Sequence, residues 1–161
     1  CTSKGHELIP IEKEVEHAKS YLKIEKYRYK NQFTYSFDVE EECLPYLCNK
    51  ITLQPMIENA IYHGVNQMID EGEIQIRIYQ EGENIIFQVE DNGVGMTQEQ
   101  CHEILHKEPG DRTGIGIKNV NDRIKIYFGE QYGLRIESEL DEGTCVTISM
   151  PKIKEENYGK K

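Results

Sequence analysis

Residues 74–91 read IQIRIYQEGENIIFQVED, and this stretch decides the kind of fold to expect. Apolar residues alternate with polar ones along both arms, and Gly82 lies in the turn between them. The alternating apolar positions are Ile74, Ile76, Ile78, Ile85, Phe87 and Val89. A period of two on both sides of a turn predicts a β-hairpin with one buried face.

A second hairpin is expected towards the end of the chain. Its turn is predicted at residues 141–143, and its apolar partners are Leu134, Ile136 and Leu140 on one arm with Val146, Ile148 and Met150 on the other. Strands that come in antiparallel pairs, rather than singly between helices, favour a two-layer α+β sandwich over a doubly wound sheet.

Helical spacing of apolar residues marks three further segments, at 11–32, 52–64 and 114–128. The middle one carries a full core-facing stripe from Leu53 to Ile61, with Thr52 as its expected cap and Pro55 tolerated in the first turn. A short polar helix is expected at 97–107. Residues 33–39 alternate as a half-buried strand does, and residues 40–43 read as a charged loop.

Composition excludes some classes of function. Nineteen basic and 29 acidic residues give a net charge of −10, which argues against a general nucleic-acid binder. No apolar run approaches the roughly 20 residues that a membrane span requires. The five cysteines form no CxxC pair, and reduced thiols are the simplest interpretation.

Oxygen-bearing side chains gather at one edge of the helix predicted at 52–64. Glu58 and Asn59 are adjacent there, and His63 lies one turn after Asn59. A polar helix edge is usually just solvated. An amide oxygen beside glycine-rich loops could also complete the shell of Mg²⁺, which favours hard oxygen ligands and phosphate partners.

Two such loops follow. DNGVGM at 91–96 comes directly after a strand, so that an Asp lies at the strand end and two glycines let the backbone approach a planar ligand. TGIGIKN at 113–119 opens a helix, whose N-terminal amides favour anions. Each loop alone is a weak signal, and the chain contains no GxxxxGK[ST] phosphate loop.

Taken in order, these motifs resemble one superfamily. ENAIYHG (58–64), DNGVG (91–95), GIGIKNV (114–120) with Arg123, and Gly143-Thr144 resemble the boxes of the Bergerat ATP-binding fold, which gyrase, MutL, heat-shock chaperones and histidine kinases share. LQP (53–55) before the first box and YLKIEKYRY (21–29) narrow the resemblance to sensor histidine kinases of the LytS/YesM type. It covers about residues 12–151 and implies a mixed, mainly antiparallel sheet after an N-terminal helix.

The resemblance implies ATP and Mg²⁺ as ligands, with residue roles carried over by position. Asn59 would hold Mg²⁺, Asp91 would accept from the adenine amino group, and Glu58 and His63 would support the triphosphate as catalytic groups. The remaining implied nucleotide contacts are Gly93, Gly95, Met96, Gly114, Ile115, Gly116, Ile117 and Thr144. A lid over the nucleotide is expected at 97–113.

Two departures from the family pattern bear on activity. Tyr62 stands where the family usually has a phosphate-binding Lys, and Lys118 or Arg112 is expected to compensate. Pro55 stands where hydrolytic relatives keep the Glu that activates water, so transfer to a protein nucleophile is expected instead of steady hydrolysis.

The resemblance also implies an organisation. Residues 1–32 would be an approach or stalk helix from a missing upstream dimerisation module, 33–151 the ATP-binding catalytic domain, and 152–161 a charged tail. The acceptor would be a histidine on the missing module rather than His6 or His17. The phosphoryl group would then pass to a response regulator. The whole protein would be a bacterial homodimer, cytoplasmic here and anchored in the cell membrane through the missing N-terminal region. An ordinary amphipathic helix packed on its own domain is the alternative for 11–32.

Three other readings of the function remain. Tyr62 suggests a nucleotide-sensing pseudokinase or adaptor domain, and an anti-sigma serine kinase shares the same fold. HEILH at 102–106 matches the HExxH signature of zinc proteases. No third ligand follows at the expected spacing, and the segment falls within the predicted lid, so we interpret the match as chance.

Overall fold

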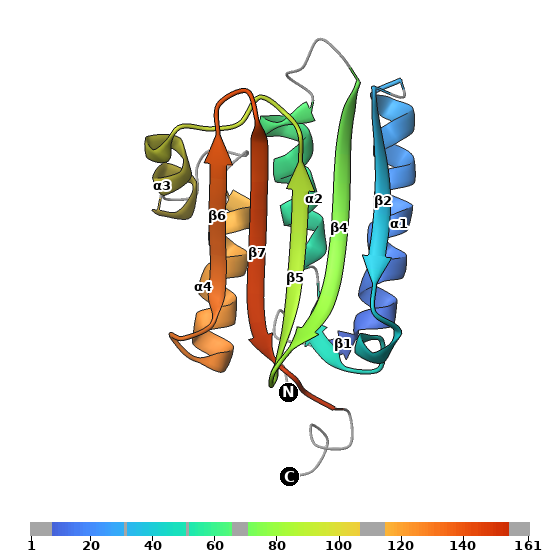
Figure 1. Ribbon diagram of the computed structural model, residues 1–161. Helices are drawn as coiled ribbons and strands as arrows, with labels where there is room; N and C mark the ends of the chain where they lie inside the picture. Colours follow the sequence, from blue (N-terminus) through green and yellow to red (C-terminus); the bar gives the residue numbers. More distant parts are fainter. Residues whose placement is uncertain (1–7, 31, 51, 66–70, 107–114, 155–161) are drawn as a thin grey trace.

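The computed structural model describes residues 8–30, 32–50, 52–65, 71–106 and 115–154. They form a sheet of strand order β2-β4-β5-β7-β6, with α1, α2 and α4 on one of its faces and α3 beside the β6 edge (Figure 1). The strands are β2 (Phe33–Val39), β4 (Gly72–Glu81), β5 (Asn84–Asp91), β6 (Gly133–Glu139) and β7 (Gly143–Pro151). The helices are α1 (Ile11–Arg28), α2 (Leu53–His63), α3 (Gln98–His106) and α4 (Ile115–Phe128). The predicted two-layer α+β sandwich is confirmed.

The sheet is mixed, as expected. β2 runs parallel to β4, because the chain crosses over through α2 and returns in the same direction, whereas the other three strand pairs are antiparallel. Both predicted hairpins are present. In the first turn Gly82 has a φ of 62°, a conformation that glycine adopts without strain.

The second hairpin is shorter than predicted on its first arm. Leu134 and Ile136 lie in β6 opposite β7, as expected. The expected strand position of Leu140 is wrong, since this residue follows the end of β6 and is 58% exposed. The chain already turns at Asp141, which has a φ of 66°, and Met150 finds its partner on β5 instead.

A small second sheet lies outside the sequence prediction. β1 (Leu8–Pro10) pairs antiparallel with β3 (Leu47–Asn49), and three-residue strands are too short to show a period of two. The charged loop expected before β3 is instead a 3₁₀ helix, η1 (Glu41–Cys43), and the Cys43 side chain is fully buried.

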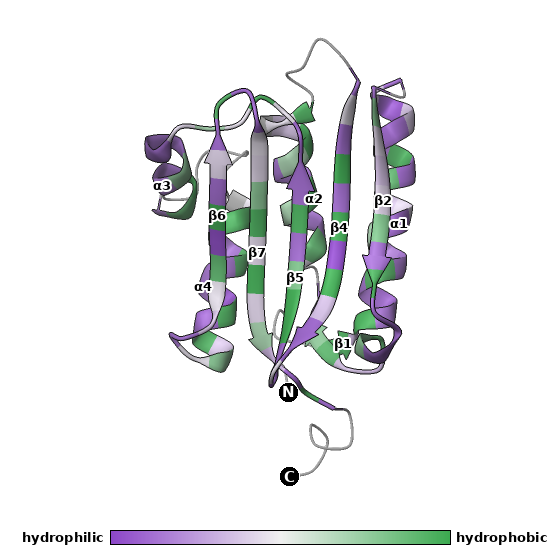
Figure 2. Ribbon diagram, viewed as in Figure 1, coloured by the Kyte–Doolittle hydropathy of each residue, from purple (hydrophilic) through white to green (hydrophobic). Residues whose placement is uncertain are grey.

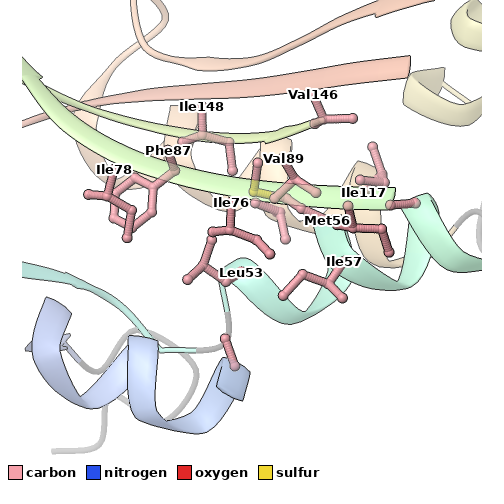
Figure 3. Packing of buried hydrophobic residues seen from close by; sticks show 14 of the residues in the cluster. Leu53, Met56, Ile57, Ile76, Ile78, Phe87, Val89, Ile117, Val146 and Ile148 are labelled. Atoms are coloured by element: carbon pink, nitrogen blue, oxygen red, sulfur yellow. The ribbon is translucent and has the colours of Figure 1, made fainter. Parts of the chain in front are cut away.

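The core lies between the sheet and α2. The apolar stripe of α2 packs against the inward side chains of β4, β5 and β7 and against α4 (Figure 3). The labelled members of this cluster are Leu53, Met56, Ile57, Ile76, Ile78, Phe87, Val89, Ile117, Val146 and Ile148. Hydrophobic and hydrophilic residues alternate along the strands of this sheet, as a sheet covered on one face requires (Figure 2).

α1 packs into the same core, as an amphipathic helix of this domain would. Ile11, Val15, Ala18 and Leu22 are buried in the cluster that contains the α2 stripe. The helix ends at Arg28, earlier than the predicted residue 32. Within the described ranges, no helix combines the length and the apolar character needed to cross a bilayer. α1 begins at Ile11, directly after the strand β1, and the attachment of residues 1–32 to an upstream dimerisation module stays a prediction.

Glu14 of α1 caps the start of α2. Its Oε2 atom accepts hydrogen bonds from the backbone amides of Thr52, at 2.6 Å, and Leu53, at 2.8 Å. Thr52 is the N-cap residue of α2, as expected, but its side chain makes no capping hydrogen bond, because its hydroxyl donates to the Asn49 carbonyl oxygen instead. The buried carboxylate of one helix therefore satisfies amides at the N-terminus of the other.

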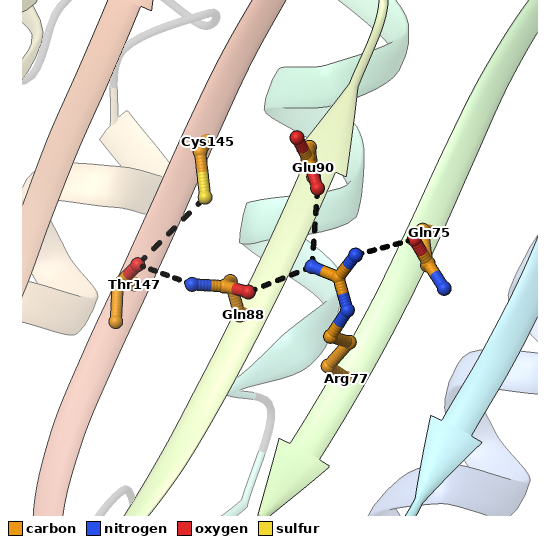
Figure 4. A network of polar contacts seen from close by, with 6 residues as sticks. All are labelled: Gln75, Arg77, Gln88, Glu90, Cys145 and Thr147. Carbon is orange, nitrogen blue, oxygen red and sulfur yellow. Dashed lines mark hydrogen bonds and ion pairs between the residues drawn. The ribbon is translucent and has the colours of Figure 1, made fainter.

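The opposite face of the sheet is polar. Arg77 on β4 donates to the side-chain oxygens of Gln75, Gln88 and Glu90, at 2.7, 2.8 and 3.0 Å (Figure 4). Gln88 in turn donates to Thr147 on β7. Cross-strand polar contacts of this kind stabilise an exposed sheet face.

Candidate functional site

Asn59 lies on the edge of α2 and is buried without a partner. It is 3% exposed, and neither its Oδ1 nor its Nδ2 atom has a hydrogen-bond partner in the described part of the chain. A buried polar group without a partner costs on the order of 1–3 kcal/mol. The side chain is therefore poised to bind something that the polypeptide does not provide.

A cavity of about 600 Å³ adjoins this side chain. Among its lining residues, Pro55, Glu58, Asn59 and Tyr62 come from α2, and Gly116 and Ile117 come from the start of α4. An amide oxygen and a carboxylate in one cavity form a donor set that suits a hard cation such as Mg²⁺. The structure thus brings together four of the predicted site residues, namely Glu58, Asn59, Gly116 and Ile117.

Gly116 allows α4 to begin close to α2. A Cβ atom on Gly116 would lie 2.9 Å from the Cβ of Pro55, which is too close for a real contact. Ile117 follows and is 1% exposed in the core. Gly114 and the side chain of Ile115 lie outside the described residues, as does the side chain of His63, so their predicted roles stay predictions.

Asp91 ends β5 and is 5% exposed. Burial raises the pKa of its carboxyl to about 7, although hydrogen bonds from the backbone amides of Gly93 and Thr144 act in the opposite direction. Its Oδ1 atom accepts the Gly93 hydrogen bond at 2.7 Å. An acid with this pKa can act as a proton donor or an acceptor near neutral pH, depending on its ligand.

Backbone segments pack closely around the Asp91 carboxyl. A Cβ on Gly64, the residue after α2, would lie 2.5 Å from Asp91 Oδ1, and a Cβ on Gly93 would clash with the Gly64 backbone. The two glycines let the end of α2 touch the end of β5 directly. Gly64 thereby links the Asp91 cluster to the helix that carries Asn59, although Asp91 is not among the described residues that line the Asn59 cavity.

Ser138 on β6 connects several of the predicted nucleotide contacts. Its hydroxyl oxygen accepts from the Met96 amide at 2.7 Å and lies 2.7 Å from the hydroxyl oxygen of Thr144. Met96 and Thr144 are both buried, and Gly95 has a φ of 77° that suits glycine. Sequence reasoning missed Ser138, because one serine in an alternating strand carries no signal of its own.

The first part of the predicted lid is helical. α3 spans Gln98–His106, close to the expected 97–107, whereas residues 107–113 lie outside the described residues. His102 and His106 stack with ring centroids 4.2 Å apart, and His106 Nδ1 lies 2.9 Å from the His102 carbonyl oxygen. The described residues contain no group of three or more His, Cys, Asp or Glu side chains that could hold a metal ion.

The chain is similar to one ATPase family and to bacterial sensor proteins. Residues 48–154 match the family described as histidine kinase-, DNA gyrase B-, and HSP90-like ATPase. Over 147 residues the chain is 32% identical to the sensor protein LytS of Bacillus cereus, covering 90% of this chain. It is 34% identical over 145 residues to the sensor histidine kinase YesM of Bacillus subtilis, again covering 90% of this chain. The chain spans about a quarter of the length of these relatives, 25% and 24%.

Solved structures show the same fold. The catalytic domain of histidine kinase ThkA superposes with a TM-score of 0.69 at 13% identity, covering 92% of this chain and 98% of that domain. The mycobacterial sensor histidine kinase MprB superposes with a TM-score of 0.66 at 15% identity, covering 92% and 99% of the two chains. The sandwich is therefore that of histidine kinase catalytic domains.

Proposed function

Because the chain belongs to the histidine kinase-, DNA gyrase B-, and HSP90-like ATPase family, we propose that it binds MgATP beside α2. The buried, unpartnered amide of Asn59 at a cavity carries this proposal. Asn59 would hold Mg²⁺, which would offset the negative charge of the phosphates. Asp91 would accept from the adenine amino group, and Gly95, Met96 and Thr144 would surround the base. Glu58, His63 and the segment 114–117 would adjoin the triphosphate.

The proposed reaction is phosphoryl transfer to a histidine. The unprotonated imidazole nitrogen forms a bond to the γ-phosphorus as the bond between that phosphorus and the ADP oxygen breaks, and the other ring nitrogen then gives up its proton. The two curated relatives are named as a sensor protein and a sensor histidine kinase, and Pro55 occupies the place of the base that would activate water. The acceptor histidine would lie upstream in a homodimeric, membrane-anchored protein, and a response regulator would receive the phosphoryl group.

Asn59→Ala tests the magnesium site. We expect the variant to lose at least about tenfold in ATP affinity when Mg²⁺ is present, because a hydrogen bond or ligand contact to a charged group contributes about 1.5–3 kcal/mol. With Mg²⁺ removed by chelation, the variant and the parent protein should bind ATP with similar affinity. Calorimetric titration measures both conditions. An equal loss in the two conditions would contradict a metal-binding role for Asn59.

The kinase proposal is tested on the full-length protein with ATP labelled at the γ-phosphate. Acid-labile label on a histidine upstream of this chain is expected, whereas the isolated chain should bind ATP without incorporating label. Label on His6 or His17 would contradict the proposed position of the acceptor. Tyr62 favours a second candidate function, a nucleotide-sensing adaptor, and ATP binding without any transfer in the full-length protein would support that alternative.

Nucleotide affinity should depend on pH through Asp91. The ionised carboxylate is a stronger acceptor for the adenine amine than the protonated acid, and the pKa of Asp91 is about 7 in the unliganded protein. We therefore expect MgATP affinity to rise about tenfold between pH 6 and pH 8 and to level off above that. A series of calorimetric titrations measures this profile. A flat profile would show that Asp91 is not the titrating acceptor.

A further inference from the structure

Arg28, the last residue of α1, lines the same cavity as Asn59. Tyr29 lies beside it on the cavity wall. Among the described lining residues, Arg28 is the one with a positive charge and Glu58 the one with a negative charge. Glu58 would repel a polyphosphate bound in this cavity, so a positive charge close to the phosphates is needed to offset that repulsion.

Of the two cations expected from sequence, only Lys118 is among the described residues, and it does not line this cavity. Lys118 on α4 forms an ion pair with Asp122 at 2.8 Å and is absent from the described lining of the cavity. Arg112 lies outside the described residues. Tyr62 occupies the position where a Lys was expected. In the described part of the chain, the charge that this Lys would supply is available from α1 instead of α2 or α4.

The guanidinium of Arg28 is anchored at one edge. Its Nη1 atom donates to the two carboxylate oxygens of Glu25, at 3.2 and 3.4 Å, and the Glu25 side chain is 6% exposed. The Arg28 side chain itself is 59% exposed, so most of the group remains open to a ligand. A guanidinium has five donors in a planar fork that matches phosphate oxygens.

Tyr62 helps to hold this end of α1. The Tyr29 and Tyr62 rings meet edge to face, with centroids 6.4 Å apart. Burial first, and then a hydrogen bond with Tyr62, raise the pKa of Tyr29 to about 12. One turn earlier on α2, Glu58 forms a hydrogen bond with Tyr21 of α1. The residue in the lysine position thus contacts the neighbour of Arg28.

We propose that Arg28 supplies the positive charge that meets the terminal phosphates of a nucleoside triphosphate bound beside Asn59. The inference rests on the proposed ATP binding and adds a ligand from the approach helix to the site. Arg28 would donate to phosphate oxygens from the part of the guanidinium that Glu25 does not engage. No bond is formed or broken in this step.

Arg28→Ala is expected to weaken MgATP binding about tenfold, because charge-assisted hydrogen bonds to phosphate are among the strong ones. The loss should be smaller for ADP and absent for AMP, which lacks the terminal phosphates. Arg28→Lys should recover part of the ATP affinity. Calorimetric titration of the three nucleotides in Mg²⁺ measures these differences, and thermal unfolding checks that each variant is folded.

Two matched variants separate this role from others. Lys23→Ala removes the same charge from an exposed position on α1 and should leave ATP affinity within about twofold. The second comparison is between Glu25→Gln and Glu25→Gln/Arg28→Ala. Because glutamine replaces the buried carboxylate in both proteins, the loss of Arg28 leaves no buried acid unpaired. The same ATP-selective loss is expected in that pair.

Some outcomes would overturn the inference. An equal loss for ATP, ADP and AMP would mean that Arg28 only maintains the structure, and an unchanged ATP affinity would exclude the contact. A loss in Lys23→Ala as large as in Arg28→Ala would indicate a diffuse charge effect. If the parent protein binds none of the three nucleotides, the proposed function itself is wrong, and the inference fails with it.

Discussion

Asp91→Asn is expected to lose ATP binding by more than about a hundredfold while making the unliganded protein more stable at pH 8. The loss follows because the amide NH₂ group would face the adenine amine, donor against donor, and buried unpaired polar groups of this kind discriminate strongly. The gain in stability follows because the substitution removes a negative charge whose burial, at this 5% exposed position, destabilises the folded protein at pH 8.

The sign of the stability effect follows from proton binding. The Asp91 pKa is raised from 3.8 to about 7, so between these values the native state binds more protons than the unfolded state. The contribution of Asp91 to stability therefore falls as pH rises from about 4 to 7 and is constant above 7. Its full cost at pH 8 is at most about 4 kcal/mol. The substituted asparagine would recover only part of this, because it has one acceptor oxygen in place of two, whereas the backbone amides of Gly93 and Thr144 both donate to Asp91.

Asp38→Asn is the matched control, because Asp38 lies on β2 with its side chain exposed. It should change neither ATP affinity nor the unfolding temperature by much. Calorimetry measures binding, and thermal unfolding at pH 5 and pH 8 measures stability, with a larger gain for Asp91→Asn at pH 8. Parent-like ATP binding by Asp91→Asn would refute the adenine role. A variant no more stable than the parent at pH 8 would refute the cost of the buried charge.

Glu14→Ala is expected to lower the free energy of unfolding by about 3 kcal/mol. Two amides at the start of α2 would lose their acceptor in a buried environment. Arg123 would be affected as well. Burial lowers the pKa of its guanidinium, and the negative charge of Glu14 raises that pKa again, so the substitution removes a charge that compensates for burial. Because α2 carries Asn59, a frayed start of this helix should weaken ATP binding as well.

Glu14→Gln should cost less, because its carbonyl oxygen can still accept from both amides. Glu16→Ala removes an exposed carboxylate two positions along α1 and should stay within about 0.5 kcal/mol of the parent protein. Urea unfolding gives the three free energies. If Glu14→Ala unfolds at the same urea concentration as Glu16→Ala, the buried cap does not stabilise α2.

The elements that sequence predicts correctly are those with a local period. The hairpin at 74–91 and the stripe of α2 place each apolar residue within a few positions of the next, so burial of one face is visible in the spacing alone. Asp91 is recognisable as a candidate site residue because it ends such a strand before two glycines. Leu140 shows the limit, since its apolar character extends the predicted strand to the edge of the turn at Asp141.

Contacts between distant segments required the tertiary structure. Glu14 caps α2 across 38 positions, and β2 pairs in parallel with β4 rather than with a sequence neighbour. Neither leaves a period in the sequence, because each depends on how whole elements pack. The pKa of Asp91 depends in the same way on burial by the backbone around it.

Sequence alone was sufficient for the family, the two-layer sandwich and the principal candidates Asn59 and Asp91, because short motifs and local periods carry that information. Only the packed structure showed that Arg28 from α1 shares a cavity with Asn59 and that Glu14 supports the helix that carries Asn59. The physical reason is that a side chain's type is local, whereas its burial, partners and charge environment arise from segments that folding brings together.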